Sequence, residues 1–198
     1  MSAIELRDAE PDDLPMARRI LGLAFATEPF TENMYGAAPL DRLRGSLDEY
    51  RRWPADDQLV VVATIADTVV GVAGATRGGS CHRCDRPAPP LSADATRAER
   101  VDHEFLARVT VGHQSFQREP HGHIASVAVD PAAQGLGVGR VLVPGLIEWL
   151  RSERSEPILL ECVTGRAAFY EHCGFTRLEE FDDPGAPGLR AVLMRRDH

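Results

Sequence analysis

Apolar and polar residues alternate in distinct patterns along the first half of the chain. The short run at residues 4–7 predicts a strand, and the valine-rich segments 58–66 and 68–76 predict a β-hairpin. Between them, apolar residues at helical spacing predict one helix after the acidic pair Asp12-Asp13, reaching Phe25, and a second helix over 40–53. The second helix is expected to bury Leu43, Leu47 and Tyr50. Residues 27–39 are expected to interrupt the two helices.

The second half of the chain predicts a longer alternation of helices and strands. Helical patterns cover 94–116, 137–150 and 166–173, while runs of apolar residues that predict strands cover 124–129, 157–162, 175–181 and 189–194. The order of elements is therefore β-α-α-β-β-α-β-α-β-α-β-β. This order predicts an α/β sandwich with a mixed sheet.

A glycine-rich turn joins the apolar strand 124–129 to the helix that follows it. The turn reads Gln134-Gly-Leu-Gly-Val-Gly-Arg140 and comes after Asp130-Pro131. Strand, glycine-rich turn and helix N-terminus together form a site for an anion, because backbone N–H groups converge there and the helix dipole favours negative charge. A dinucleotide fingerprint fails because Arg140 stands where its third glycine is needed, and a Walker loop fails because the chain has no lysine.

Composition narrows the class of protein further. The 198 residues fit one domain, 1–198, of ordinary apolar content, without a signal peptide or an apolar run long enough to span a membrane. We therefore expect a cytoplasmic protein, either a monomer or a homodimer. The net charge of -8 argues against nucleic acid as a partner and suits a cationic substrate. The four cysteines are expected to be free thiols.

Two motifs together resemble a known family. The Gln134–Arg140 turn, directly after a Val-x-Val-Asp-Pro strand end, resembles the acyl-CoA pyrophosphate loop of the GNAT superfamily of N-acetyltransferases. The segment 165–175, with Phe169-Tyr170 and a terminal Gly174-Phe175, resembles the second signature of that family, in the expected order. Within the superfamily, residues 120–194 resemble the puromycin N-acetyltransferase subgroup.

The resemblance implies a GNAT-type mixed sheet, flanked by helices on both faces, whose strands splay apart to receive acetyl-CoA as the co-substrate. It implies that the backbone of three strand residues pairs with the pantetheine and that the turn binds the diphosphate. The implied cofactor-binding residues are Val127, Ala128, Val129, Gln134, Gly135, Leu136, Gly137, Val138, Gly139 and Arg140. For Gln134 and Arg140, an ordinary solvated position is the alternative.

The resemblance also implies a general acid and leaves several candidates for the base. Tyr170 is the implied acid for the sulfur of CoA, with a half-buried helix tyrosine as the alternative. Glu161 is the candidate base, acting directly or through a water, and a solvated or ion-paired carboxylate is its alternative. His123 is held in reserve as a second base, with Glu119 and His121 behind it.

The acceptor is expected to be the primary amine of a small molecule, of which an antibiotic-like compound is one case. Glu28, Phe30 and Tyr35 are the expected substrate-binding residues, an acid for a cation and aromatic rings for stacking. Two alternatives stay open: acetylation of a protein or peptide, and a non-catalytic acyl-CoA sensor. Cys81 and Cys84, with His103 or His113, form too weak a pattern for zinc, and we expect no metal.

Overall fold

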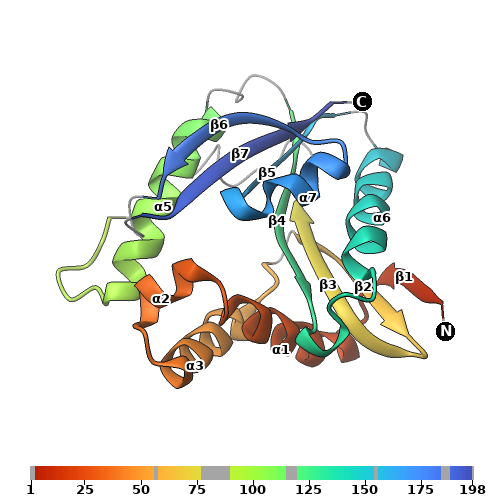
Figure 1. Ribbon diagram of the computed structural model, residues 1–198, viewed down its shortest axis with the longest axis horizontal. Coiled ribbons are helices and arrows are strands. Elements are labelled where there is room, and N and C mark those ends of the chain that lie inside the picture. Colours follow the sequence, from red (N-terminus) through yellow and green to blue (C-terminus); the bar gives the residue numbers. More distant parts are fainter. Residues whose placement is uncertain are drawn as a thin grey trace.

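The computed structural model describes residues 3–55, 58–76, 90–114, 120–153, 156–183 and 188–197. Within these residues, seven strands form one mixed sheet in the order β1-β2-β3-β4-β5-β7-β6 (Figure 1). Neighbouring strands are antiparallel except β4 and β5, which are parallel. The strands are β1 (Ile4–Asp8), β2 (Gln58–Ile65), β3 (Thr68–Thr76), β4 (Gly122–Val129), β5 (Ile158–Val163), β6 (Thr176–Asp182) and β7 (Arg190–Arg196).

Helices cover both faces of this sheet, which confirms the α/β fold predicted from the sequence. On one face, α6 packs its apolar side, including Leu142 and Leu146, against β2, β3 and β4. On the other face, α1 packs Ile20 and Leu21 against β3 and β4. The described helices are α1 (Leu14–Phe25), α2 (Pro29–Tyr35), α3 (Pro39–Glu49), α5 (Arg97–Gln114), α6 (Val138–Glu153) and α7 (Ala167–His172). None of them is long and apolar enough to cross a lipid bilayer.

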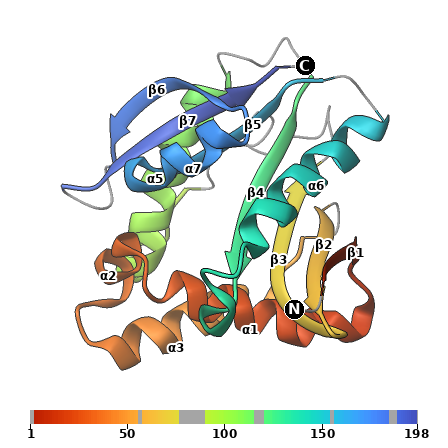
Figure 2. The ribbon, with the colours of Figure 1, turned by 45° about the vertical axis from the view of Figure 1, so that its right-hand side comes forward.

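The parallel pair β4–β5 holds together over only a short stretch. Its register begins at Gly122 with Ile158 and ends at Ile124 with Leu160, although both strands continue. On its other side, β4 stays paired with β3 as far as Val129, with a bulge at Ala125. A bulge bends a strand and increases its twist, so β4 turns away from β5 where the bulge lies. Figure 2 shows the two strands diverging beyond this point. The splayed strands expected from the sequence are thus present.

Two details of the helices differ from the sequence prediction. Residues 27–39 contain α2, a helix that was not expected there, and Pro29 occupies its first turn. Proline suits this position because the first N–H groups of a helix have no partner within the helix. The second difference is Leu47 on α3, which was expected to be buried but is 39% exposed. Leu47 lies over Gly22 of α1, so only part of its surface is covered.

Candidate functional site

The glycine-rich turn joins β4 to α6 at the end of β4 that has left β5. Gly135 and Gly137 have φ of 82° and 86°, in the left-handed region that residues with a Cβ rarely adopt. A Cβ on either of them would meet nothing within 4 Å. The side chain of Val138, in contrast, is buried, and its Cγ1 lies 2.7 Å from where a Cβ on Gly71 would stand. Close packing at Gly71 therefore fixes the start of α6 against the sheet, while the turn stays open.

The amide groups of this turn are largely available. From Gly135 to Arg140, two N–H groups donate within the turn: Leu136 N–H to the carbonyl of Ala133, and Arg140 N–H to the carbonyl of Gly137. The other four, at Gly135, Gly137, Val138 and Gly139, make no hydrogen bond among the residues that the structure describes. The first N–H groups of any helix lack partners within it. Four such donors on one turn fit a diphosphate.

The other expected co-substrate residues have different surroundings. Val127 and Val129 are half-buried and Ala128 is buried. Pairing with β5 ends at Ile124, so the backbones of these three residues have no paired strand on that side. The side-chain amide of Gln134 reaches back to the carbonyl of Val129, at 3.5 Å. Leu136 is 52% exposed, and Arg140 is also exposed beside the turn. These side chains border the turn, while the hydrogen-bond donors of the turn are its backbone N–H groups.

Tyr170 is held on α7 by a set of aromatic contacts. Its ring meets Phe169 at a centroid distance of 5.1 Å and Phe175 at 6.0 Å, both edge-on. Burial raises the pKa of Tyr170 well above its usual value, and the neighbouring Cys162 and Cys173 raise it further. The phenol therefore stays protonated across the neutral range, as a hydrogen-bond donor must.

The two candidate bases contact each other. His123 on β4 and Glu161 on β5 are 38 residues apart in sequence, yet His123 Nε2 lies 3.0 Å from Glu161 Oε2. Their side chains are only 4% and 7% exposed. The contact flanks the last pair of β4 and β5, Ile124 with Leu160, where the strands begin to diverge. Glu161 is thus neither a solvated carboxylate nor an isolated base, but half of a buried pair.

The three expected substrate-binding residues lie in different contacts. Glu28, which precedes α2, accepts a hydrogen bond from Arg166 at 2.7 Å, and Arg166 lies just before α7. Phe30 packs on Phe105 of α5 with ring centroids 6.3 Å apart.

Tyr35, the third of them, lies against Gly45 of α3 and donates its hydroxyl proton to Glu49 at 3.0 Å. Its role is therefore at least partly to pack α2 on α3. Glu28 is the one whose contact reaches the Tyr170 helix.

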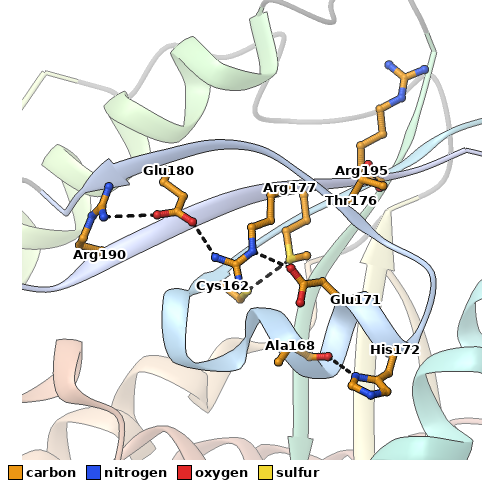
Figure 3. Close-up of polar contacts among 10 residues, drawn as sticks. Cys162, Ala168, Glu171, His172, Thr176, Arg177, Glu180, Arg190 and Arg195 are labelled. Carbon is orange, nitrogen blue, oxygen red and sulfur yellow. Dashed lines mark hydrogen bonds and ion pairs between the residues drawn. The ribbon is translucent and has the colours of Figure 1, made fainter.

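A chain of charged groups fastens α7 to the outer strands (Figure 3). Arg177 of β6 donates to Glu171 of α7 and to Glu180, each at 2.6 Å, and Glu180 also contacts Arg190 at 3.4 Å. These side chains are partly exposed, so each pair is worth little by itself. Together they fix α7 relative to β6, and α7 carries Tyr170.

Sequence patterns missed two features of this region. Arg166 and Glu28 are far apart in sequence, and no local signal pairs them. Ser126 and Thr76 appeared to be ordinary strand residues, yet their hydroxyls are buried without a hydrogen-bond partner in the part of the chain that the structure describes. Cys81 and Cys84 lie outside the described residues. Within those residues, no group of three or more His, Cys, Asp and Glu could hold a metal ion.

Comparison with protein families identifies the architecture. A model of the acetyltransferase (GNAT) family matches residues 27–175, which include the turn, the His123–Glu161 pair and Tyr170. Two curated relatives are glucosamine 6-phosphate N-acetyltransferases. The protein of Oryza sativa subsp. japonica is 30% identical over 110 residues, covering 45% of this chain and 67% of the relative. That of Trypanosoma brucei brucei is 39% identical over 108 residues, covering 44% and 73%.

Solved structures share the fold over nearly the whole chain. A histone acetyltransferase HPA2 and related acetyltransferase from Corynebacterium glutamicum has a TM-score of 0.65 at 21% identity, covering 100% of this chain and 97% of that chain. A mosquito arylalkylamine N-acetyltransferase like 5b has a TM-score of 0.65 at 19% identity, covering 98% and 99%.

The expected membership of the puromycin N-acetyltransferase subgroup is not borne out, because the curated relatives act on glucosamine 6-phosphate. The family model, in contrast, spans well over half of the chain. The chain therefore belongs to the GNAT family and is an acetyl-CoA-dependent N-acetyltransferase.

Proposed function

We propose that this enzyme acetylates the primary amine of a small polar molecule, with the His123–Glu161 pair as its base and Tyr170 as its acid. The observation that carries the proposal is the 3.0 Å contact between His123 and Glu161, buried where β4 and β5 separate. The reaction needs a base next to the thioester, and the thioester lies between the diverging strands. The buried His123–Glu161 pair lies at that place.

The pair has a definite division of roles. An ionised carboxylate only accepts hydrogen bonds, so the contact has Nε2–H of His123 donating to Oε2 of Glu161. With Glu161 as its partner, the imidazole of His123 takes the proton of the amine, directly or through a water. Glu161 orients the ring and stabilises the imidazolium that forms.

The transfer then balances as follows. The amine nitrogen attacks the thioester carbonyl carbon, forming a C–N bond, and a backbone N–H near Val129 stabilises the oxyanion. The C–S bond breaks, and the sulfur leaves with a proton from Tyr170. The raised pKa keeps the phenol protonated before the reaction, so that it holds a proton near the sulfur. The proton that the amine loses goes to the imidazole.

The size of the acceptor is proposed from the relatives and from the charge of the chain. The two curated relatives are named for glucosamine 6-phosphate, a small amine. The negative net charge suits an acceptor whose amine carries a positive charge before it is deprotonated. We include glucosamine and glucosamine 6-phosphate among the first acceptors to test.

Release of free CoA thiol tests the proposal. Purified protein with acetyl-CoA should release thiol in the presence of small amines, and a peptide with a free N-terminus should give little. Tyr170→Phe should lower kcat by about 10²-fold or more, as removal of a general acid does. The matched control is Tyr50→Phe, which removes another half-buried phenol, one in tilted contact with Phe25 at a centroid distance of 5.2 Å, and should leave kcat unchanged.

The alternatives give different results. If the peptide alone is acetylated, the enzyme is a protein N-acetyltransferase. If acetyl-CoA binds and no amine releases thiol, the chain is a sensor and the proposed chemistry is wrong. If Tyr170→Phe turns over amines like the wild type, Tyr170 is not the acid.

A further inference from the structure

Three buried polar atoms on one face of the sheet have no hydrogen-bond partner within the described residues. They are the hydroxyls of Ser126 on β4 and Thr76 on β3 and the indole N–H of Trp53. Ser126 is 7% exposed and Thr76 is 2% exposed. Buried polar groups in native proteins are almost always hydrogen-bonded, so each exception requires a reason.

Two of these groups converge on one point. Gly74 of β3 pairs with Ser126 of β4. A Cβ on Gly74 would lie 3.1 Å from the Ser126 hydroxyl, and 2.6 Å and 3.3 Å from Cζ2 and Cε2 of Trp53. Cε2 is bonded to the indole nitrogen. The Ser126 hydroxyl and the Cζ2–Cε2 edge of the indole, next to its N–H, therefore both lie over Gly74, where a larger residue would displace them.

The same face carries the His123–Glu161 pair. Val72 and Ala128, paired across β3 and β4, face α1, so Gly74 and Ser126, two positions along, face the same way. Beyond the bulge at Ala125, Ala75 pairs with Ile124 and Thr76 with His123, so Thr76 and His123, two positions along β3 from Gly74, face the α1 side again. Ser126 and His123 lie opposite Gly74 and Thr76, which are two residues apart on β3. Ser126 and His123 are therefore about 7 Å apart along the sheet, the rise of two strand residues.

We propose that Ser126, Trp53 and Thr76 form an acceptor-oxygen subsite, which binds an oxygen carried two or three bonds from the amine that His123 deprotonates. The spacing suits a 2-amino alcohol, the unit that amino sugars contain. The Ser126 hydroxyl and the Trp53 N–H bind that oxygen, and Thr76 lies directly across from His123 on β3. This inference rests on the proposed function and specifies its acceptor.

A structural role does not explain the three groups. A hydroxyl that serves the fold is bonded to a backbone or side-chain partner, and removing it leaves that partner unsatisfied. Ser126 has no such partner in the described chain. A buried polar group without a hydrogen-bond partner lowers the stability of a protein. Proteins keep such groups mainly at binding sites, where a ligand supplies the partner.

The test compares trans-2-aminocyclohexanol with cyclohexylamine, which differ by one hydroxyl. The wild type should show a kcat/KM at least tenfold higher for the amino alcohol, because a site built for a hydroxyl rejects the analogue that lacks it. Ser126→Ala should reduce this preference severalfold. Comparing the ratio between variants cancels the difference in basicity of the two amines. The matched control is Ser46→Ala on α3, another buried orphan hydroxyl, which should leave the preference unchanged.

Melting temperature supplies a readout that does not depend on turnover. Ser126→Ala should melt no lower than the wild type, and trans-2-aminocyclohexanol should raise the Tm of the wild type more than that of the variant. A Tm several degrees lower for Ser126→Ala would show that the hydroxyl is bonded within the fold and would overturn the subsite. Equal use of both amines by the wild type would also overturn it. A failure of His123 or Tyr170 variants to affect turnover would instead refute the proposed base and acid.

Discussion

The contact between His123 and Glu161 allows a quantitative prediction. Glu161→Gln keeps the volume of the side chain but removes its charge. A hydrogen bond to a charged group is worth about 1.5–3 kcal/mol when its partners are buried, as they are here. If Glu161 stabilises the imidazolium by that amount, kcat/KM falls about 10- to 150-fold. His123→Asn removes the proton acceptor itself, so its loss should reach about 10²- to 10⁴-fold.

The double variant decides whether the two groups act as one base. Glu161 acts only through the imidazole, so His123→Asn/Glu161→Gln should be no slower than His123→Asn alone. The assay is the initial rate of thiol release at subsaturating amine, measured alongside urea unfolding. Glu161→Gln should lower the free energy of unfolding by about 1.5–3 kcal/mol.

Glu179→Gln is the matched control. It removes an ion pair with Arg108 on a partly exposed surface of β6, which should cost less than about 1 kcal/mol and leave kcat/KM intact. If the losses of the two single variants multiply in the double variant, His123 and Glu161 act independently, and the description of a single paired base is wrong.

Three further changes test other parts of the structure. Gly137→Ala forces a residue with a Cβ into the left-handed region, which should lower the free energy of unfolding by about 1–2 kcal/mol and weaken the binding of acetyl-CoA, as measured by calorimetry. The control is Gly188→Ala, with φ of 85°, which should lower stability as much and leave binding unchanged. The hydrogen bond from Arg7 lowers the pKa of Asp13, so the stability that Asp13 contributes is present above its unfolded pKa and is lost as the pH falls through its folded pKa. In an acid unfolding titration, the free energy of unfolding of Asp13→Asn should therefore fall less over this pH range than that of the wild type. Burial raises the pKa of Cys162 to about 12, so iodoacetamide should label it slowly at pH 8, as mass spectrometry of the peptide would show; rapid labelling would contradict its burial.

Local patterns in the sequence predicted most of the fold because they act over a few residues. The turn at 134–140 is identifiable because glycine is needed wherever φ is positive, as it is at Gly135 and Gly137. The helix α2 falls within residues 27–39, which the pattern predicts to interrupt the helices, because a proline such as Pro29 ends a helix in some contexts and begins one in others.

The site itself depended on contacts that no local pattern contains. His123 and Glu161 meet only because β4 and β5 run parallel in one particular register, set by strands far apart in sequence. Either residue alone supported a base; their contact could not be predicted. The orphan hydroxyl of Ser126 likewise depends on the bulge at Ala125, which decides the face that Ser126 occupies.

The divergence of β4 from β5 also bears on how the molecule avoids aggregation. Unpaired strand edges at the rim of a sheet invite other chains to add to them. Here the unpaired stretches, beyond Ile124 and Leu160, face each other in the middle of the sheet, between strands that are covered on their outer sides by β3 and β7. Another protein's strand would need both neighbours to part before it could enter. A slender molecule that carries its own amide groups needs no such opening to lie between the two strands, so the same gap that resists strand addition leaves room for a small extended ligand.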